Sequence, residues 1–243
     1  MIDSTAIRDR LADVRARIAR AAGRAGRDPA SIRLVAVSKT FDADHVRAAA
    51  DAGQIDFGEN KVQEALDKMA ATADLPIRWH LVGHLQSNKA RKVGRFDVVH
   101  SMDTAALVRK VDETAVLAER RIDLLAQVDL AGEATKHGAR EEDLPPIFEA
   151  GAGAHAVRVV GLMLLPPAFD DAEGSRPYFR ALRDLRERLV AGGMDPAMLG
   201  ELSMGMSHDF EVAVEEGATL VRVGSAIFGP RVNVRPRSDS APT

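Results

Sequence analysis

The chain has 243 residues, 46% of them hydrophobic, so it is long enough to bury a large core in one α/β barrel or in two small domains. Its 33 basic and 36 acidic residues nearly cancel, which argues against nucleic acid or an anionic membrane as the main partner. It contains no cysteine, which excludes disulfides, thiolate nucleophiles and zinc–thiolate sites. No apolar stretch approaches the roughly 20 residues of a membrane span and no signal-peptide core is present, so we expect a cytoplasmic protein.

The first 28 residues predict an amphipathic helix packed on the rest of the domain. Ile7, Leu11, Val14 and Ile18 recur at helical spacing behind a Ser4 cap. The segment is as rich in arginine as a transit peptide, but aspartates interrupt it, which favours a packed helix.

After this helix, short apolar runs alternate with helical patterns, which is typical of βαβ units and a parallel sheet. The expected strands are 32–38, 54–58, 78–83, 97–101, 122–129, 156–163, 198–203 and 219–224. The expected helices lie near 42–52, 60–72, 87–94, 104–120, 141–152, 175–191 and 207–216. Eight strands in a chain of this length predict a single (β/α)8 TIM barrel, for which about 250 residues is typical. The barrel and its N-terminal helix would span 1–234, followed by a polar, disordered tail at 235–243.

An open doubly wound sheet is the alternative fold. It would normally show a Gly-rich dinucleotide fingerprint after the first strand, and the segment 38–41 is not one. In the barrel, chemistry is expected at the carboxyl ends of the strands. The chemistry-bearing residues at these ends are Lys39, Glu59, Asn60, His84, Ser101, Lys136, His137, Met163, Ser203, Arg222, Gly224 and Ser225.

Lys39 closes the first buried strand, so its amine would lie at the rim of the core. Desolvation disfavours an ammonium ion and frees a neutral amine that can attack an aldehyde or ketone. Lys39 is therefore a candidate Schiff-base former. The alternative is a lysine that extends its side chain into water.

Asn60 follows the second strand, where it could cap the next helix or bind a ligand. His80 and His84 share one face of the third strand by alternation, which would suit a pair of metal ligands. No carboxylate stands at a recognised ligand spacing, and Ser87 or Asn88 is typical of a helix cap, so we predict no metal site.

Asp103 and Asp129 are the carboxylates that would be needed for glycoside hydrolysis. Each stands where a cap or turn residue is expected. The sequence therefore gives that reaction no support.

The loops after strands seven and eight are where barrels commonly bind phosphate through backbone N–H groups and small residues. Ser203, Gly224 and Ser225 suit that role, although ordinary capping and turn formation would explain each loop alone. Arg222 shares a strand face with Gly224, so its guanidinium should point into the barrel mouth. A buried guanidinium needs an acceptor, which could be a core carboxylate (Glu201 or Asp209) or a ring nitrogen of a ligand.

Six motifs, taken together, resemble the pyridoxal-phosphate homeostasis proteins (the YggS/PROSC family). They are 36–40, 57–64, 79–89, 161–163, 202–207 and 221–229, in order along nearly the whole chain. The resemblance implies a single barrel of the alanine racemase N-terminal-domain kind, which is the fold-type III class of proteins that bind pyridoxal 5′-phosphate (PLP). It also implies roles for individual residues, with Lys39 holding PLP as a Schiff base, Ser203, Gly224 and Ser225 holding the phosphate, and Arg222 facing the pyridine nitrogen.

Asn60 and His84 complete the residues expected to bind the cofactor. Two details depart from the family pattern. Ser225 stands where many members have threonine, which preserves the hydroxyl. The segment Thr135-Lys136-His137-Gly138 replaces a more usual Ser-Lys-Ser-Gly, which puts any secondary role of Lys136 in doubt.

The residues favour a carrier over an enzyme. PLP stabilises carbanions best when a carboxylate protonates its ring nitrogen, whereas Arg222 can only donate a hydrogen bond to it. The alanine racemase family takes a second base, a tyrosine, from a domain that this chain lacks, and the one tyrosine here, Tyr178, stands in a predicted helix. We therefore expect a monomeric PLP-homeostasis protein with no catalytic residues, which would pass its cofactor to apo forms of PLP-dependent enzymes. The alternatives are a fold-type III racemase or decarboxylase, and a PLP-independent class I aldolase.

Overall fold

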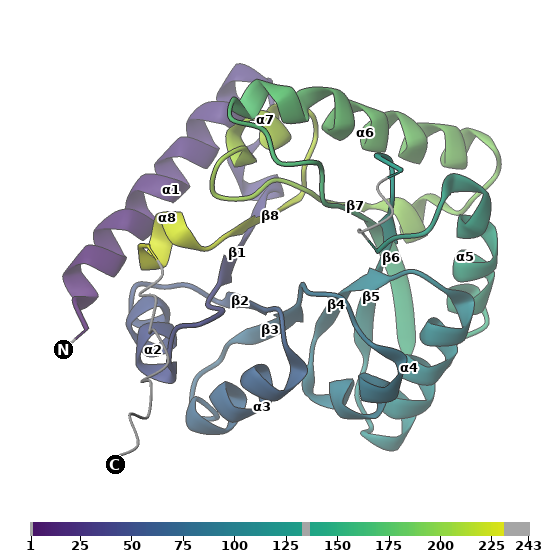
Figure 1. Cartoon of the computed structure of the whole chain (residues 1–243), viewed down its shortest axis with the longest axis horizontal. Helices are drawn as coiled ribbons and strands as arrows, with labels where there is room; N and C mark the ends of the chain where they lie inside the picture. Colours follow the sequence, from purple (N-terminus) through teal and green to yellow (C-terminus); the bar gives the residue numbers. More distant parts are fainter. Residues whose placement is uncertain (1, 133–136, 231–243) are drawn as a thin grey trace, which may run out of the picture.

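The computed structural model describes residues 2–132 and 137–230, and these form a closed barrel of parallel strands in the order β1 to β8. The strands are β1 (Arg33–Val37), β2 (Asp56–Glu59), β3 (Arg78–Leu81), β4 (Val98–Met102), β5 (Ile122–Val128), β6 (Val157–Leu164), β7 (Glu201–Ser203) and β8 (Leu220–Val223). Figure 1 looks into the ring of strands, with the helices outside it. The predicted (β/α)8 barrel is confirmed.

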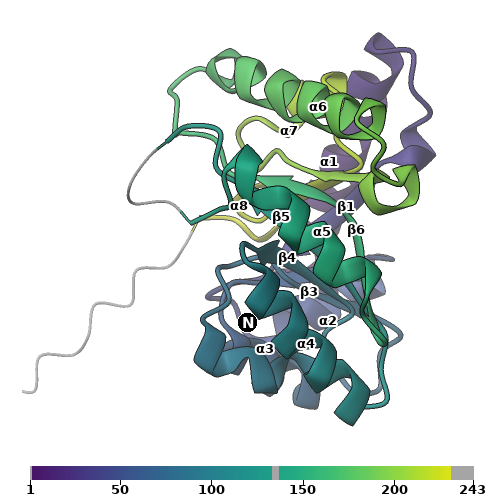
Figure 2. The same cartoon turned by 90° about the vertical axis from the view of Figure 1, so that its right-hand side faces the viewer.

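Helices follow the strands in turn. They are α1 (Ser4–Arg24), α2 (Ala43–Asp51), α3 (Val62–Ala71), α4 (Ala105–Leu117), α5 (Leu144–Ala152), α6 (Arg176–Ala191), α7 (Phe210–Glu215) and α8 (Ser225–Phe228). Short 3₁₀ helices are Pro29–Ser31, Ser87–Arg95, Glu141–Asp143, Ala172–Ser175 and Pro196–Leu199. Figure 2 shows α4 and α5 side by side on the outer face of the barrel, where they pack together.

Helix α1 packs on the barrel as predicted. Its four spaced apolar residues are all buried, and it contacts α2, α7 and α8. The expected cap was wrong by one residue. Asp3 is the N-cap, with its carboxylate accepting from Ala6 N at 3.0 Å, while Ser4 already lies in the first turn. An N-cap residue has a non-helical backbone, and Ser4 is already the first residue of the helix, so Asp3 takes this position.

Two other capping predictions were also wrong. The segment at 87–95 is a 3₁₀ helix whose N-cap is Gln86, without a side-chain cap bond, rather than Ser87 or Asn88. Helix α4 is capped by Thr104, whose hydroxyl accepts from Leu107 N at 3.2 Å, so Asp103 is not the cap. Asp129 is a turn residue as expected, accepting from the amides of residues 131 and 132.

The barrel interior holds two kinds of side chain. A small apolar cluster consists of Val35, Val37, Val82, Val98, Leu125, Met163 and Leu220. Buried polar side chains from β2, β3, β4, β7 and β8 are also present, and they lead to the candidate site. The tail 235–243 and Lys136 lie outside the described residues. Within the described part of the chain, no helix has the length and apolar character needed to cross a bilayer.

Candidate functional site

Lys39 lies directly after β1, half-buried, at the end of the barrel where the strands terminate. The next residue, Thr40, has a left-handed backbone with φ 71°, which is uncommon for a residue other than glycine. Its amide donates to Glu64 Oε1 at 2.7 Å, which holds this turn in place. The chain therefore turns sharply just beyond the lysine.

A buried ion pair supports the backbone on the other side of Lys39. Lys68 of α3 donates to Glu59 Oε1 at 2.6 Å and to the carbonyl of Ser38 at 2.8 Å. Ser38 Oγ donates to the same Glu59 oxygen at 2.7 Å. Burial raises the pKa of Glu59, although the bonds from Lys68 and Ser38 oppose it. Glu59 Oε2 is buried with no hydrogen-bond partner in the described structure. Lys68 was not among the expected site residues, and its only signal in the sequence is its position four residues after Glu64 on one helix face.

Arg222 is buried in β8 and donates to Ser203 Oγ at 2.6 Å and to the carbonyl of Leu164 at 2.9 Å. Both carboxylates considered as its partners are bonded elsewhere, Glu201 to Thr219 and Asp209 to Ser175. Burial lowers the pKa of Arg222 to about 10, against the opposing charge of Asp209. That value is well above neutrality, so the guanidinium stays charged.

Ser203 connects Arg222 to a chain of buried polar groups that the sequence analysis did not identify. His100 Nδ1 lies 2.8 Å from Ser203 Oγ, and His100 Nε2 lies 2.9 Å from His80 Nδ1. His80 Nε2 lies 2.9 Å from Asp56 Oδ1. The chain thus runs through the barrel from Asp56, at the start of β2, to Arg222.

The direction of the protons along this chain follows from its two ends. Burial lowers the pKa of both His80 and His100, so both rings are neutral. Burial opposes ionisation of Asp56, but the hydrogen bond from His80 and nearby arginines lower its pKa overall. A carboxylate only accepts and a guanidinium only donates. Each group therefore donates toward Asp56: Arg222 to Ser203, Ser203 to His100, His100 to His80, and His80 to the carboxylate.

A pair of backbone amides faces the mouth between β8 and α8. The amides of Gly224 and Ala226 both donate to Ser207 Oγ, at 3.0 and 3.4 Å. A Cβ atom added at Gly224 would lie 3.0 Å from the carbonyl oxygen of Val37, so this position suits glycine. Ser225 beside them is exposed. Ser207 was missed, although it lies in the loop after β7 where a phosphate was expected.

Asn60 is exposed at the end of β2. It does not cap α3, because the N-cap is Lys61, which makes no side-chain cap bond. Gly83 packs against the backbone of Asn60, where an added Cβ would lie 2.3 Å from the carbonyl oxygen. The backbone of Asn60 is thus packed against Gly83 at the mouth, and its side chain is exposed.

His84 lies on the rim, apart from His80. Its ring stacks on that of His137, with centroids 3.5 Å apart and 10° between the planes. His84 Nδ1 is 3.6 Å from Asp103 Oδ2, and the two side chains are 28% and 20% exposed. Burial and His137 lower the pKa of His84, while Asp103 opposes them.

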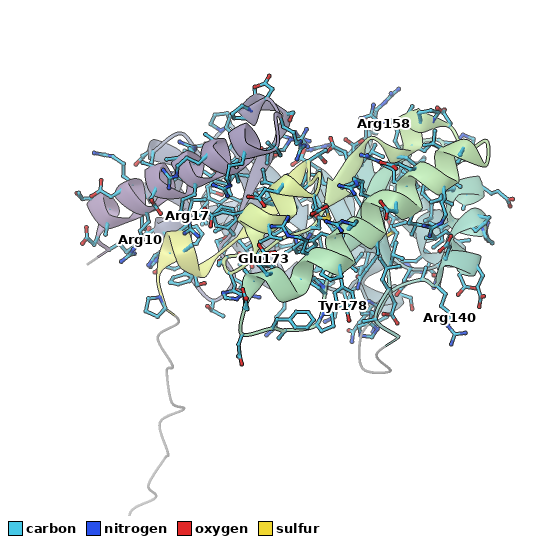
Figure 3. All side chains as sticks on the ribbon, turned by 90° about the horizontal axis from the view of Figure 1, so that it is seen from above. Arg10, Arg17, Arg140, Arg158, Glu173 and Tyr178 are labelled. Carbon is cyan, nitrogen blue, oxygen red and sulfur yellow. The ribbon has the colours of Figure 1, made fainter. Side chains whose placement is uncertain are left out.

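Tyr178 lies in the first turn of α6, as predicted, with its ring 5.8 Å from that of Phe169. Figure 3 shows the barrel from the side. Arg158, near the start of β6, lies at one end of the barrel. Arg140, which follows β5, lies with Tyr178 at the other end, where the strands terminate. The tyrosine therefore lies in a helix, as expected, but at the mouth end of the barrel, where the sequence had not placed it, and it packs on Phe169.

Three comparisons place this architecture among known proteins. The family model of the alanine racemase N-terminal domain matches residues 2–232. The pyridoxal phosphate homeostasis protein of Aquifex aeolicus is 42% identical over 224 residues, covering 92% of this chain and 97% of that protein. The protein of the same name from Pseudomonas aeruginosa is 44% identical over 226 residues, covering 93% and 96%.

Solved structures agree with these matches. PipY of Synechococcus elongatus with PLP bound is 40% identical, with a TM-score of 0.81, covering 92% of this chain and all of that one (100%). An alanine racemase of Clostridium difficile, 14% identical with a TM-score of 0.68, shares the fold over 58% of its length. The chain belongs to the family of pyridoxal phosphate homeostasis proteins, built on the alanine racemase N-terminal-domain fold.

Proposed function

We propose that this protein binds PLP covalently through Lys39 and acts in intracellular PLP homeostasis without strong catalytic turnover. The observation that carries the proposal is the position of a half-buried lysine in the same barrel mouth as a buried, charged arginine and a pair of backbone donors. The PLP-bound structure of PipY, at 40% identity, supports it.

The residues present fit the three chemical groups of PLP. Lys39 provides the amine for the aldehyde. The amides of Gly224 and Ala226, which donate to Ser207 Oγ in this structure, would provide two donors for the phosphate once the Ser207 hydroxyl turns aside, and Ser207 and Ser225 add hydroxyls. Glycine at 224 lets a ligand approach the backbone closely.

Ser203 was expected at the phosphate, but its oxygen is fully buried between Arg222 and His100. We propose that Ser203 instead fixes the orientation of Arg222, and that Ser207 takes its place beside the phosphate. Arg222 would face the ring nitrogen, because its guanidinium is the buried cation at the mouth end of the chain of polar groups. Asn60 and His84, at the ends of β2 and β3, would lie at the edge of the ring.

Arg222 also accounts for weak turnover. Bound PLP supplies an aldehyde that condenses with amines and a ring that draws electrons best when its nitrogen is protonated. A guanidinium with a pKa of about 10 donates a hydrogen bond and keeps its proton at neutral pH. With Ser203 and Leu164 holding it in place, Arg222 would keep a facing nitrogen unprotonated.

Three further features remain proposals. Apo forms of PLP-dependent enzymes would receive the cofactor, the protein would act as a monomer, and it would work in the cytoplasm. The balanced charge of the chain, which formally sums to −3, supports a role that involves neither nucleic acid nor an anionic membrane.

Absorbance and borohydride trapping test the proposal. Protein incubated with PLP and then desalted should retain a visible absorption band, and borohydride should fix PLP on the peptide that contains Lys39. Lys39→Ala should lose both signals, whereas Lys110→Ala, a change at an exposed lysine of α4, should keep them. Absence of the band, or label mainly on another lysine, would contradict the proposal.

The same preparations separate the alternatives. Substantial racemisation or decarboxylation of an amino acid, abolished in Lys39→Ala, would favour the enzyme. Trapping with a sugar phosphate but not with PLP would favour the aldolase.

A further inference from the structure

Three residues able to bind a metal ion meet at the rim of the barrel mouth. His84 follows β3, Asp103 follows β4 and His137 follows β5, so three consecutive strands each contribute one. One donor atom from each lies within 4.8 Å of the others. The binding of the phosphate, the aldehyde and the ring nitrogen of PLP makes no use of Asp103 or His137.

The distance between His84 and Asp103 is informative. Their nearest atoms, Nδ1 and Oδ2, are 3.6 Å apart, which is too far for a hydrogen bond. Two ligands of one zinc ion, each about 2.0–2.1 Å from it at the tetrahedral angle, lie roughly 3.4 Å apart. The spacing is therefore close to that of two ligands that share an ion.

The stacking of His84 on His137 determines how the two rings could share an ion. Their centroids are 3.5 Å apart and their planes differ by 10°. A neutral imidazole keeps a lone pair in the plane of its ring. Because a metal–nitrogen bond lies in that plane, one of two parallel rings must turn to share an ion. His137 is exposed, so its ring has room to turn.

We propose that His84, Asp103 and His137 form a binding site for a divalent transition-metal ion, and that Zn²⁺ is the ion it fits best. Two imidazoles and one carboxylate match the three protein ligands of an open zinc site, with the fourth position left to water. The carboxylate offsets part of the ion's charge. Partial exposure of the cluster lets the ion keep its water ligand.

A single substitution, His137→Ser, can remove this site. His137 is the exposed member of the cluster, so His137→Ser removes one ligand at the surface. A bound ion would connect the loops after β3, β4 and β5 at the mouth. The substitution thus removes the site without altering a buried residue.

Calorimetry on the untagged protein, with and without PLP, tests the proposal, using Zn²⁺ as the titrant. We expect one Zn²⁺ per chain, and we expect Co²⁺ in its place to give the visible absorption of a four- or five-coordinate ion. His137→Ser and Asp103→Ala should each weaken binding more than tenfold. His155→Ala, at an exposed histidine outside the cluster, should bind as the unmodified protein does.

Thermal unfolding gives an independent readout. Zn²⁺ in excess should raise the melting temperature of the unmodified protein and of His155→Ala, but not that of His137→Ser. The PLP absorption band of His137→Ser, unchanged, shows that the mouth is intact. Zinc affinity that is the same in His137→Ser as in the unmodified protein, or no zinc binding at all, would overturn the proposal.

Discussion

The histidines of this barrel occupy two contrasting regions. Inside, His80 and His100 are fully buried, and each ring nitrogen lies 2.8–2.9 Å from a partner. On the rim, His84 and His137 stack face to face, and the nearest carboxylate lies beyond hydrogen-bond distance. The charged groups at the two ends of the inner chain therefore set one tautomer and one proton direction for the inner pair, whereas the outer pair is at least partly exposed and open to a ligand.

The inner region has a clear physical role. A buried charge is costly unless it is compensated, and Arg222 has no carboxylate bonded to it in the described structure. The chain of neutral groups joins it to the ionised Asp56, with every donor aimed toward the anion. The guanidinium is thus held in one orientation by groups that no solvent reaches.

The largest expected effect comes from breaking the inner chain with His100→Leu. This change leaves the hydroxyl proton of Ser203 and Nδ1 of His80 without their buried partner, while Ser203 keeps Arg222 and His80 keeps Asp56, and each lost partner costs about 1–3 kcal/mol. We expect the free energy of unfolding, measured by urea titration, to fall by about 2–4 kcal/mol in total. His155→Ala, at an exposed histidine, should change it by less than about 0.5 kcal/mol. If the two variants lose similar amounts, the inner chain does not stabilise the barrel.

Acid should destabilise the protein through the same pair. Burial lowers the pKa of His80 and His100 in the folded chain, while an unfolded histidine has a pKa of about 6.5. Below that pH the unfolded chain takes up protons that the folded chain does not, so stability falls as the pH falls. The slope approaches about 1.4 kcal/mol per pH unit for each histidine well below pH 6.5, and the loss for both between pH 6.5 and 5.5 is at most about 2 kcal/mol.

Urea titrations at several pH values measure this slope. In His100→Leu the slope should drop by about half. Glu59 works in the opposite direction, because its pKa is raised by burial, and comparing the two proteins at each pH cancels its contribution. Equal slopes in the two proteins would mean that His100 takes up a proton in the folded state.

The sequence predicted the strands well and the caps poorly. Most strand residues are buried by the barrel interior and the helices, so most strands form short, largely apolar runs that can be recognised without knowing their neighbours. Caps depend on the backbone geometry of a single residue. Asp3 rather than Ser4 caps α1, and Gln86 precedes the 3₁₀ helix where Ser87 or Asn88 was expected.

The candidate site could also be predicted only in part. Strand ends indicate which residues gather at the mouth, but not which partner each one takes. Alternation placed His80 and His84 on one face, whereas His80 in fact bonds His100 of the neighbouring strand. That pairing depends on the register of β3 against β4, in which His80 lies opposite Val98, and the register follows from closing the whole barrel.

The smallest expected effect is that of Asp103→Asn on the rim, in the absence of metal. The His84–Asp103 contact is partly exposed and lies beyond hydrogen-bond distance, and such contacts contribute about 0–1 kcal/mol. We therefore expect a change in the free energy of unfolding of less than about 0.5 kcal/mol. The adjacent Thr104→Ala is the matched control, because Thr104 is the true cap of α4 and its loss should cost about 1 kcal/mol. If Asp103→Asn costs more than Thr104→Ala, then Asp103 is a structural residue, and the rim is held by internal bonds as firmly as the interior.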